Sequence, residues 1–466
     1  MRNIFVALML FTGSVVLGQD YSSTSKKAIR EFEKAKEFFQ YKNDAEAEAL
    51  LWQTVKIDPA FTEAWFMLAQ IYLDQRKPNE AADYYLKGVM TNPDKNAYGF
   101  LKVAELEYNV GRYEEAAGHL AGWLSKEYRN EEMQMKAADL EKRINFALDA
   151  IAHPVPFNPV SLGPGINTEQ YEYWPALSID EKTIFFTVLG PQNEDMLKTK
   201  AELQEDFYFS RREENNWGMR TWLGPPVNTN ANEGAQSVTA DGKIIYFTVC
   251  NRPDGHGRLC DLYFSRVLED GSWSAPENLG DEINTTSSEK HPSITADGRK
   301  LYFVSNRPGG KGDYDVWMSE KKGDKWAKPV NLGDSINSPG MEQSPFIHPD
   351  QHSLYFTSDG WPGMGRGDIF LAKLKTDGSW TKPENLGYPI NTYNEEIGFI
   401  VNAKGTRAYF SSNRREGTDT DIFAFDLPEE LRPDPVSYIT GRVFDARTYK
   451  GIEAVFQLID LQTGEV

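Results

Sequence analysis

Cysteine and histidine are scarce in this chain, and positive charge is in deficit. Its 466 residues include two cysteines and six histidines. So few thiols exclude a disulfide-dense scaffold and a multi-cysteine zinc or iron–sulfur site, and the sequence predicts no metal site and no cofactor. With 50 Lys and Arg against 69 Asp and Glu, the net charge is −19. That charge disfavours nucleic acid and anionic lipid surfaces as partners.

Long hydrophobic runs are also missing, since no segment reaches the 18 consecutive apolar residues of a membrane-spanning helix. The N-terminus instead has Arg2, a short apolar run over residues 4–11, and small residues up to Gly18. This pattern predicts a secretory signal peptide over residues 1–18, too short for a membrane anchor. Because no cysteine comes after the cut, lipoprotein processing is not expected. The mature chain is expected to be exported to the periplasm.

What the chain has in quantity is apolar and aromatic side chains, at 40% and 13%, enough for about three packed domains. Residues 25–151 are poor in glycine and rich in helix formers. They resemble tetratricopeptide repeats, which have a period of about 34 residues. The matching positions are Trp65, Leu68, Ala69, Tyr72, Ala81, Tyr85 and Pro93. The resemblance implies an α-solenoid that ends in a capping helix over 131–151. The concave surface of this solenoid is expected to bind a peptide or to pack against the next domain of the chain.

Residues 155–427 have a different composition and a fivefold repeat. A Leu-Gly pair followed by an apolar-Asn pair recurs, and its glycines are 61, 56, 53 and 54 residues apart. Those glycines are Gly163, Gly224, Gly280, Gly333 and Gly387. The period is typical of a β-propeller blade. Because 157–163 reads as an outer strand without inner strands before it, it is expected to complete the last of five blades. A sixth, degenerate blade is the alternative.

The blade phrases at residues 295–298, 301–303 and 305–307 resemble the TolB-type propeller repeat. One carboxylate recurs per unit, at Glu172, Glu233, Glu289, Glu342 and Glu395. These acids could form a negative ring at the mouth of the channel that binds a cation or basic peptide. In the structural interpretation they pair with arginines such as Arg252, Arg307 and Arg414.

A second set of repeated acids is expected to accept backbone hydrogen bonds, with calcium as the alternative. These are Asp206, Asp261, Asp315, Asp368 and Asp421. Cys250 and Cys260 flank one blade loop and are expected to form a disulfide, the alternative being two buried thiols. No nucleophile elbow, phosphate loop or zinc-protease motif occurs, so the chain is not expected to be an enzyme.

After a linker at 428–436, residues 437–466 resemble the start of a carboxypeptidase regulatory-like β-sandwich, of which more is expected beyond the last residue. The whole order of modules resembles Bacteroidetes periplasmic proteins of the PorE type, which continue into an OmpA-like domain. The resemblance implies a non-enzymatic scaffold at the outer membrane, working in type IX secretion and gliding. Its implied partners are an outer-membrane β-barrel or periplasmic protein, and peptidoglycan through the OmpA-like domain.

Two other functions remain open at this stage. One is a glycan- or peptide-binding propeller, accessory to a hydrolase, with Trp174 or Trp361 stacking on the ligand. The other is a hydrolase, which would need two acids converging at the mouth of the channel.

Overall fold

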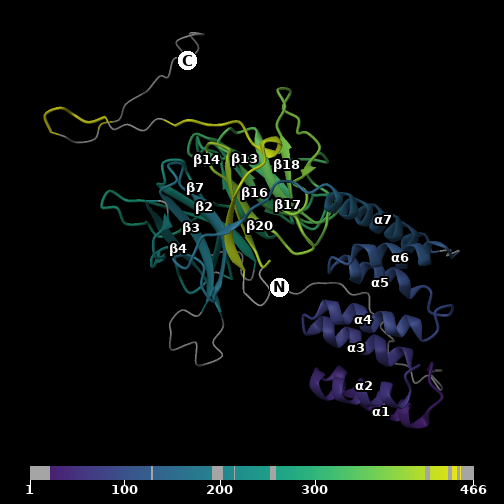
Figure 1. Ribbon diagram of the computed structural model, residues 1–466. Helices are drawn as coiled ribbons and strands as arrows, with labels where there is room; N and C mark the ends of the chain where they lie inside the picture. Colours follow the sequence, from purple (N-terminus) through teal and green to yellow (C-terminus); the bar gives the residue numbers. More distant parts are fainter. Residues whose placement is uncertain are drawn as a thin grey trace.

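The computed structural model describes residues 21–126, 130–190, 203–214, 216–251, 259–414, 420–438, 443–448 and 452. A stack of helices leads into a ring of five β-sheets, and the C-terminal segment leaves from that ring (Figure 1). The expected α-then-β order and the five-bladed propeller are confirmed. The predicted signal peptide, and most of the predicted β-sandwich, lie outside the described residues.

The helices pair as the repeat pattern predicts. They are α1 (Lys26–Gln40), α2 (Asp44–Ile57), α3 (Thr62–Asp74), α4 (Pro78–Met90), α5 (Gly99–Tyr108), α6 (Tyr113–Leu124) and the capping helix α7 (Glu131–Ala152). Leu68 and Ala81 are fully buried where α3 and α4 cross, and Tyr85 stacks on Phe66 with ring centroids 4.4 Å apart. Among the described helices, none combines the length and apolarity that a membrane crossing requires.

Each blade is an antiparallel sheet. Blade 1 comprises β2 (Tyr171–Leu177), β3 (Thr183–Gly190), β4 (Gln204–Glu213), β5 (Asn216–Trp217) and β6 (Thr221–Trp222). Blade 2 comprises β7 (Asn232–Val238), β8 (Ile244–Cys250), β9 (Cys260–Arg266) and β10 (Glu277–Asn278). Blade 3 comprises β11 (Glu289–Ile294), β12 (Lys300–Ser305), β13 (Asp315–Lys322), β14 (Lys325–Trp326) and β15 (Val330–Asn331). Blade 4 comprises β16 (Glu342–Ile347), β17 (Ser353–Ser358), β18 (Asp368–Lys373) and β19 (Glu384–Asn385).

Blade 5 closes the ring in the predicted way. Its inner strands are β20 (Ile397–Val401), β21 (Arg407–Ser412) and β22 (Asp421–Asp426), and its outer strand is β1 (Val160–Ser161) from the start of the domain. Val160 lies opposite Ala424 in this antiparallel pair. The pairing of β1 with β22 therefore joins the first and last parts of the propeller, so β22 is not left as an open sheet edge at the junction.

The recurring asparagine explains why the Leu-Gly phrase repeats. In blade 3, Asn337 is fully buried, accepts a hydrogen bond from the backbone N–H of Val316 at 2.8 Å, and donates one to its carbonyl at 3.1 Å. The same two bonds recur from Asn167, Asn228, Asn284 and Asn391 to the third strand of their own blades. One side chain per blade thus satisfies buried backbone groups that would otherwise lack partners.

The last repeat and the capping helix are sealed onto blade 4. Met364, in the loop between β17 and β18, is 1% exposed because it inserts among apolar side chains of α5, α6 and α7. Tyr108 and Tyr113 each donate a hydrogen bond at 2.7 Å to a backbone carbonyl of this loop, from Gly363 and Met364. The helical array therefore packs against the propeller, with α7 beside blade 4 in Figure 1.

The segment predicted as a linker is docked instead of free. The 3₁₀ helix η2 (Glu429–Leu431) places Leu431, 4% exposed, in the apolar core between blades 4 and 5. Tyr355 donates a hydrogen bond at 2.7 Å to the Leu431 carbonyl, and the backbone N–H of Val436 bonds to Ala403 at 2.8 Å. The buried leucine is the physical reason, since it gives this Pro- and Glu-rich segment an apolar anchor.

Candidate functional site

The repeated glutamates are buried and engaged in local hydrogen bonds. Glu172, Glu233, Glu289 and Glu342 are all 0% exposed. Each carboxylate accepts from the backbone N–H and the hydroxyl of the residue four positions earlier. Those partners are Thr168, Thr229, Thr285 and Ser338. None of these carboxylates is exposed to a passing cation, so the structure disfavours the predicted negative ring.

The fifth member of this set was assigned to the wrong residue. Glu395 is exposed, whereas Glu396 is 0% exposed and accepts the same two bonds from Thr392. Glu396 lies five residues after Asn391, the spacing found in the other four blades. Two adjacent glutamates occur here, and the constant spacing from the asparagine selects Glu396.

Among the described residues, arginines form ion pairs with Glu172, Glu289 and Glu396. Arg307 lies 3.0 Å from Glu289, and Arg414 lies 3.3 Å from Glu396, as the structural interpretation expected. Arg252, the expected partner of Glu233, lies outside the described residues. In blade 1 the partner is Arg220, from the loop beyond β5, and not a residue after the second strand.

Blade 4 has Asp359 and Gly360 after its second strand, where blades 3 and 5 have Arg307 and Arg414, and the pKa values of two of its buried acids are raised. Burial raises the pKa of Glu342 to about 7, against hydrogen bonds from Ser338 and Ser358. Burial, then the nearby Glu396 carboxylate, raises the pKa of Asp368 to about 7. Because these folded values exceed the unfolded ones near 4, their stability contribution is present at low pH and lost as pH rises through about 7.

We therefore expect the Glu342→Gln variant to show a weaker loss of stability with rising pH. Wild type should lose on the order of 2–3 kcal/mol more than this variant between about pH 4 and pH 8, because only wild type must discharge that proton. Chemical unfolding across this range measures the difference. Glu277→Gln, an acid half exposed beside Arg266, is the control and should keep the wild-type slope. Parallel curves for wild type and Glu342→Gln would contradict the assignment.

Two of the repeated aspartates accept backbone hydrogen bonds, as predicted. Asp315 accepts from the backbone N–H groups of Lys311 and Gly312, and Asp368 from that of Met364 at 2.7 Å. Asp206 and Asp261 accept side-chain bonds from Trp222 and Asn278. Within the described ranges, no three His, Cys, Asp or Glu residues are grouped to hold a metal ion.

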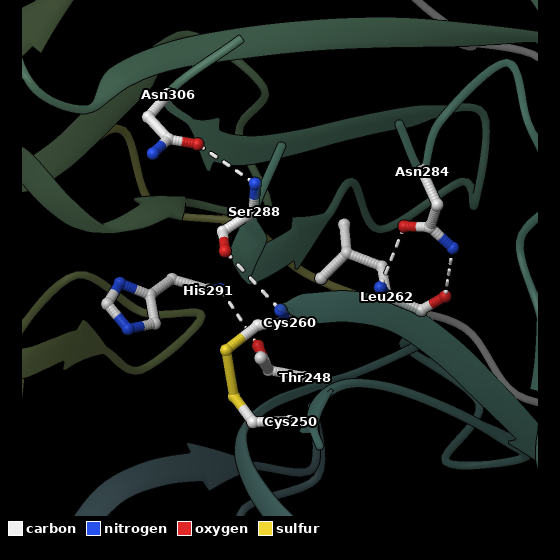
Figure 2. The surroundings of a disulfide bond; sticks show 8 residues. All are labelled: Thr248, Cys250, Cys260, Leu262, Asn284, Ser288, His291 and Asn306. Atoms are coloured by element: carbon white, nitrogen blue, oxygen red, sulfur yellow. Dashed lines mark hydrogen bonds between the residues drawn. A yellow bond between two sulfur atoms is a disulfide. The ribbon is translucent and has the colours of Figure 1, made fainter. Parts of the chain in front are cut away.

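Cys250 and Cys260 form a disulfide that joins the ends of β8 and β9 (Figure 2). Its neighbours come from blade 3: Ser288 accepts a hydrogen bond at 3.4 Å from the backbone N–H of Cys260. Figure 2 also shows Thr248, on the same strand as Cys250, accepting from the backbone N–H of His291 at 3.0 Å. The bridge therefore stabilises a strand end that contacts the next blade.

Removing this bridge should weaken the propeller moderately. The Cys250→Ser/Cys260→Ser double variant is expected to lose about 2–3 kcal/mol, as for short loops closed by a disulfide. Urea unfolding with and without reductant measures it. Reductant should bring wild type down to the double variant and leave the double variant unchanged. Equal stability of oxidised and reduced wild type would contradict this expectation.

The first strands of all five blades line an axial channel with an empty volume of about 880 Å³, including its open mouth. Each first strand is interrupted by a bulge, and the bulge residue has a positive φ. These residues are Trp174, Ala235, His291, Ser344 and Gly398, with φ between 46° and 64°. Such conformations are rare for residues other than glycine and often occur at functional sites.

Trp174 crosses the channel and touches the other blades. Its ring lies 4.9 Å from that of His291 between centroids, and its indole N–H donates to Ser344 Oγ at 3.3 Å. A Cβ on Gly398 would lie 2.8 Å from the indole, which is too close, and one on Gly234 would lie 3.0 Å from it, which is a tight contact. Trp361, the other predicted aromatic, does not line the channel; its N–H donates to the Ile336 carbonyl at 2.9 Å.

Neighbouring blades are joined at the bulges by hydroxyl groups. The hydroxyls of Thr248 and Ser411 accept hydrogen bonds from the backbone N–H of the bulge residue in the next blade. The hydroxyls of Thr187 and Thr357 donate hydrogen bonds to oxygen atoms of the next blade. Blade 3 has Val304 at this position. There, His291 Nδ1 accepts from the Ser344 N–H at 3.2 Å instead. Burial lowers the pKa of His291 to about 3, so the ring is neutral. His291 therefore replaces a missing hydroxyl and is not a free catalytic base.

Comparison with known proteins adds fold likeness only. No family model matches the chain, and no curated protein matches it. Among solved structures, it is similar to TolB from Acinetobacter baumannii at 14% identity, covering 64% of this chain and 71% of TolB, with a TM-score of 0.36. The helices are similar to the first tetratricopeptide domain of Spaghetti (RPAP3) bound to an HSP90 peptide, at 20% identity. That match covers 28% of this chain and 98% of the other, with a TM-score of 0.23.

Proposed function

We propose that this chain is a non-enzymatic protein-interaction scaffold. The observation that carries the proposal is the seal around Met364, which joins the repeat array and the propeller into one platform. The seal uses α5, α6 and α7, so the surfaces of α1 to α4 stay available for a partner. Binding would depend on area and shape rather than on a reactive group.

The finer proposal concerns where the platform works. The signal-peptide pattern and the disulfide both favour an oxidising compartment outside the cytoplasm. With the resemblance to proteins of the PorE type, this supports a periplasmic scaffold at the outer membrane, in type IX secretion and gliding. Peptidoglycan attachment through an OmpA-like domain beyond residue 466 is part of the same proposal.

The free end of the array offers a specific surface for testing. Phe38 is 39% exposed and Tyr41 is 85% exposed, both at the end of α1. Exposed aromatic residues of this kind are enriched in protein interfaces. We expect full-length tagged protein, captured from its native envelope in mild detergent, to bring down a protein partner in stoichiometric amount.

The Phe38→Glu/Tyr41→Glu variant should lose that partner by tenfold or more, because two charges would be buried on binding. Val330→Glu is the matched control, since Val330 is 53% exposed on the outer strand of blade 3. Mass spectrometry of the captured material gives the readout. Recovery of the chain alone, with glycan retained in the propeller, would contradict the scaffold and favour the accessory binding module.

A further inference from the structure

The axial channel is a blind pocket. Trp174 closes the end at which the first strands begin, since its indole contacts residues of blades 2 to 5. The loop that docks into the array comes after β17, whose last residue pairs with the first residue of β16. The array therefore lies at the closed end. The other end opens between the hairpins that join first and second strands, where Ile179, Ala240 and Ala296 line the rim.

The wall of this pocket carries no net charge. Among the described residues that line it, none is Asp, Glu, Lys or Arg. This contrasts with a chain whose net charge is −19. Aliphatic, proline and phenylalanine side chains form most of the wall, including Ile294, Phe346 and Ile400.

The polar side chains of the wall are already hydrogen-bonded within the protein. Gln236 donates to the Trp174 carbonyl and accepts from Thr187. Ser237 and Ser293 accept from backbone N–H groups of the next blade, at 3.1 and 2.9 Å. A sugar entering the pocket would lose its water contacts and find the oxygens of these side chains already accepting hydrogen bonds, so few acceptors remain for its hydroxyl groups, which is costly. The wall therefore favours an apolar occupant.

The closed end of the pocket favours an acyl chain over an apolar peptide. A peptide that enters a blind pocket end-first carries a charged terminus toward the indole, where the wall supplies no counter-charge. An acyl chain ends in a methyl group and carries no such cost. From this geometry we propose that the pocket binds one long-chain acyl group, methyl end toward Trp174, from a free fatty acid or from an acylated partner.

The open rim is polar, unlike the wall of the pocket. Four of the five hairpins there carry an exposed basic residue, namely Lys182, Lys243, Arg299 and Lys404. The five hairpins carry acids in similar number, namely Asp180, Glu181, Asp241, Asp297 and Asp350. A polar head left at the rim would therefore meet water and side chains of both charges while its chain stays in the pocket.

The test uses cis-parinaric acid, a linear polyene fatty acid that fluoresces in apolar surroundings, with the full-length protein. We expect saturable binding of one probe per chain, displaced by palmitate. Ala240→Trp and Ala296→Trp each place an indole at the rim and should weaken binding by tenfold or more. Ala275→Trp makes the same substitution at an exposed position on the outside of blade 2 and should bind like wild type.

Chain length tests the blind end. In wild type, affinity for saturated fatty acids should rise about fourfold per methylene and then stop rising once the chain reaches the indole. Trp174→Ala removes the obstruction and should move this limit to longer chains. A folded Trp174→Ala protein with the wild-type limit would overturn the blind-pocket assignment.

The source of the acyl group is decided by competition with an N-palmitoylated peptide and the same peptide unacylated. Displacement of the probe by palmitate alone identifies free fatty acid as the ligand, and stronger displacement by the palmitoylated peptide identifies an acylated partner. Equal displacement by the unacylated peptide would overturn the proposal in favour of a peptide site. Failure of the probe and of both palmitoyl ligands to bind would overturn it as well.

Discussion

Replacing Met364 by Asp is expected to separate the helical array from the propeller. Met364 is 1% exposed inside the core of α5, α6 and α7, so the variant must either bury an unpaired carboxylate or open the contact. The hydrogen bonds from Tyr108 and Tyr113 to this loop would be lost with it. We expect a loss of about 5 kcal/mol in the stability of the joined unit, at the upper end for single substitutions.

Thermal unfolding and limited proteolysis measure this effect. Wild type should unfold as one unit across the seal, whereas Met364→Asp should show separate transitions and new cleavage in the segment after α7. Met219→Asp makes the same chemical change at a residue that is 75% exposed on blade 1, and should cost less than about 0.5 kcal/mol. A single wild-type-like transition for Met364→Asp would contradict the seal.

The Arg307→Met variant is expected to cost about 3–5 kcal/mol. It leaves the Glu289 carboxylate, 0% exposed, without its cation. Arg307 also packs over the rings of Phe303 and Trp317, and methionine keeps part of that apolar contact. The expected loss therefore comes mostly from the uncompensated charge.

The double variant Glu289→Gln/Arg307→Met separates charge from packing. It should recover much of the lost stability in urea unfolding, because no buried charge is left unpaired. Arg266→Met, which removes an ion pair about half exposed on both sides, is the control and should cost at most about 1 kcal/mol. No recovery in the double variant would show that Arg307 acts by packing alone.

The architecture could be predicted well because the repeats are visible as constant spacings in the sequence. A constant spacing from glycine to asparagine to glutamate in every blade reflects one buried hydrogen-bond pattern. The same spacing identifies Glu396, and not Glu395, as the fifth glutamate of the set. The blade count was predictable from the five repeats and from the outer strand at the start of the domain, β1, which pairs with β22 at its end.

The site was harder to predict because it lies where the repeat is broken. Trp174, His291 and Gly398 occupy equivalent positions in different blades, and only the closed ring brings them together. Val304 likewise gives no sign in sequence that His291 supplies the missing hydrogen bond. The docked segment around Leu431 was unpredictable for a related reason, since its contacts include Tyr355, 76 positions earlier in the chain.

In the proposed platform, the helical array and the propeller hold one fixed position relative to each other. Spin labels are attached to cysteines introduced at Lys27, on α1, and at Lys325, on blade 3. Pulsed electron paramagnetic resonance then measures the distance between the array and the propeller. The native cysteines are not labelled, because they form a disulfide. A single narrow distance distribution in wild type, broadened in Met364→Asp, is the expected result. A broad distribution in wild type would contradict the platform.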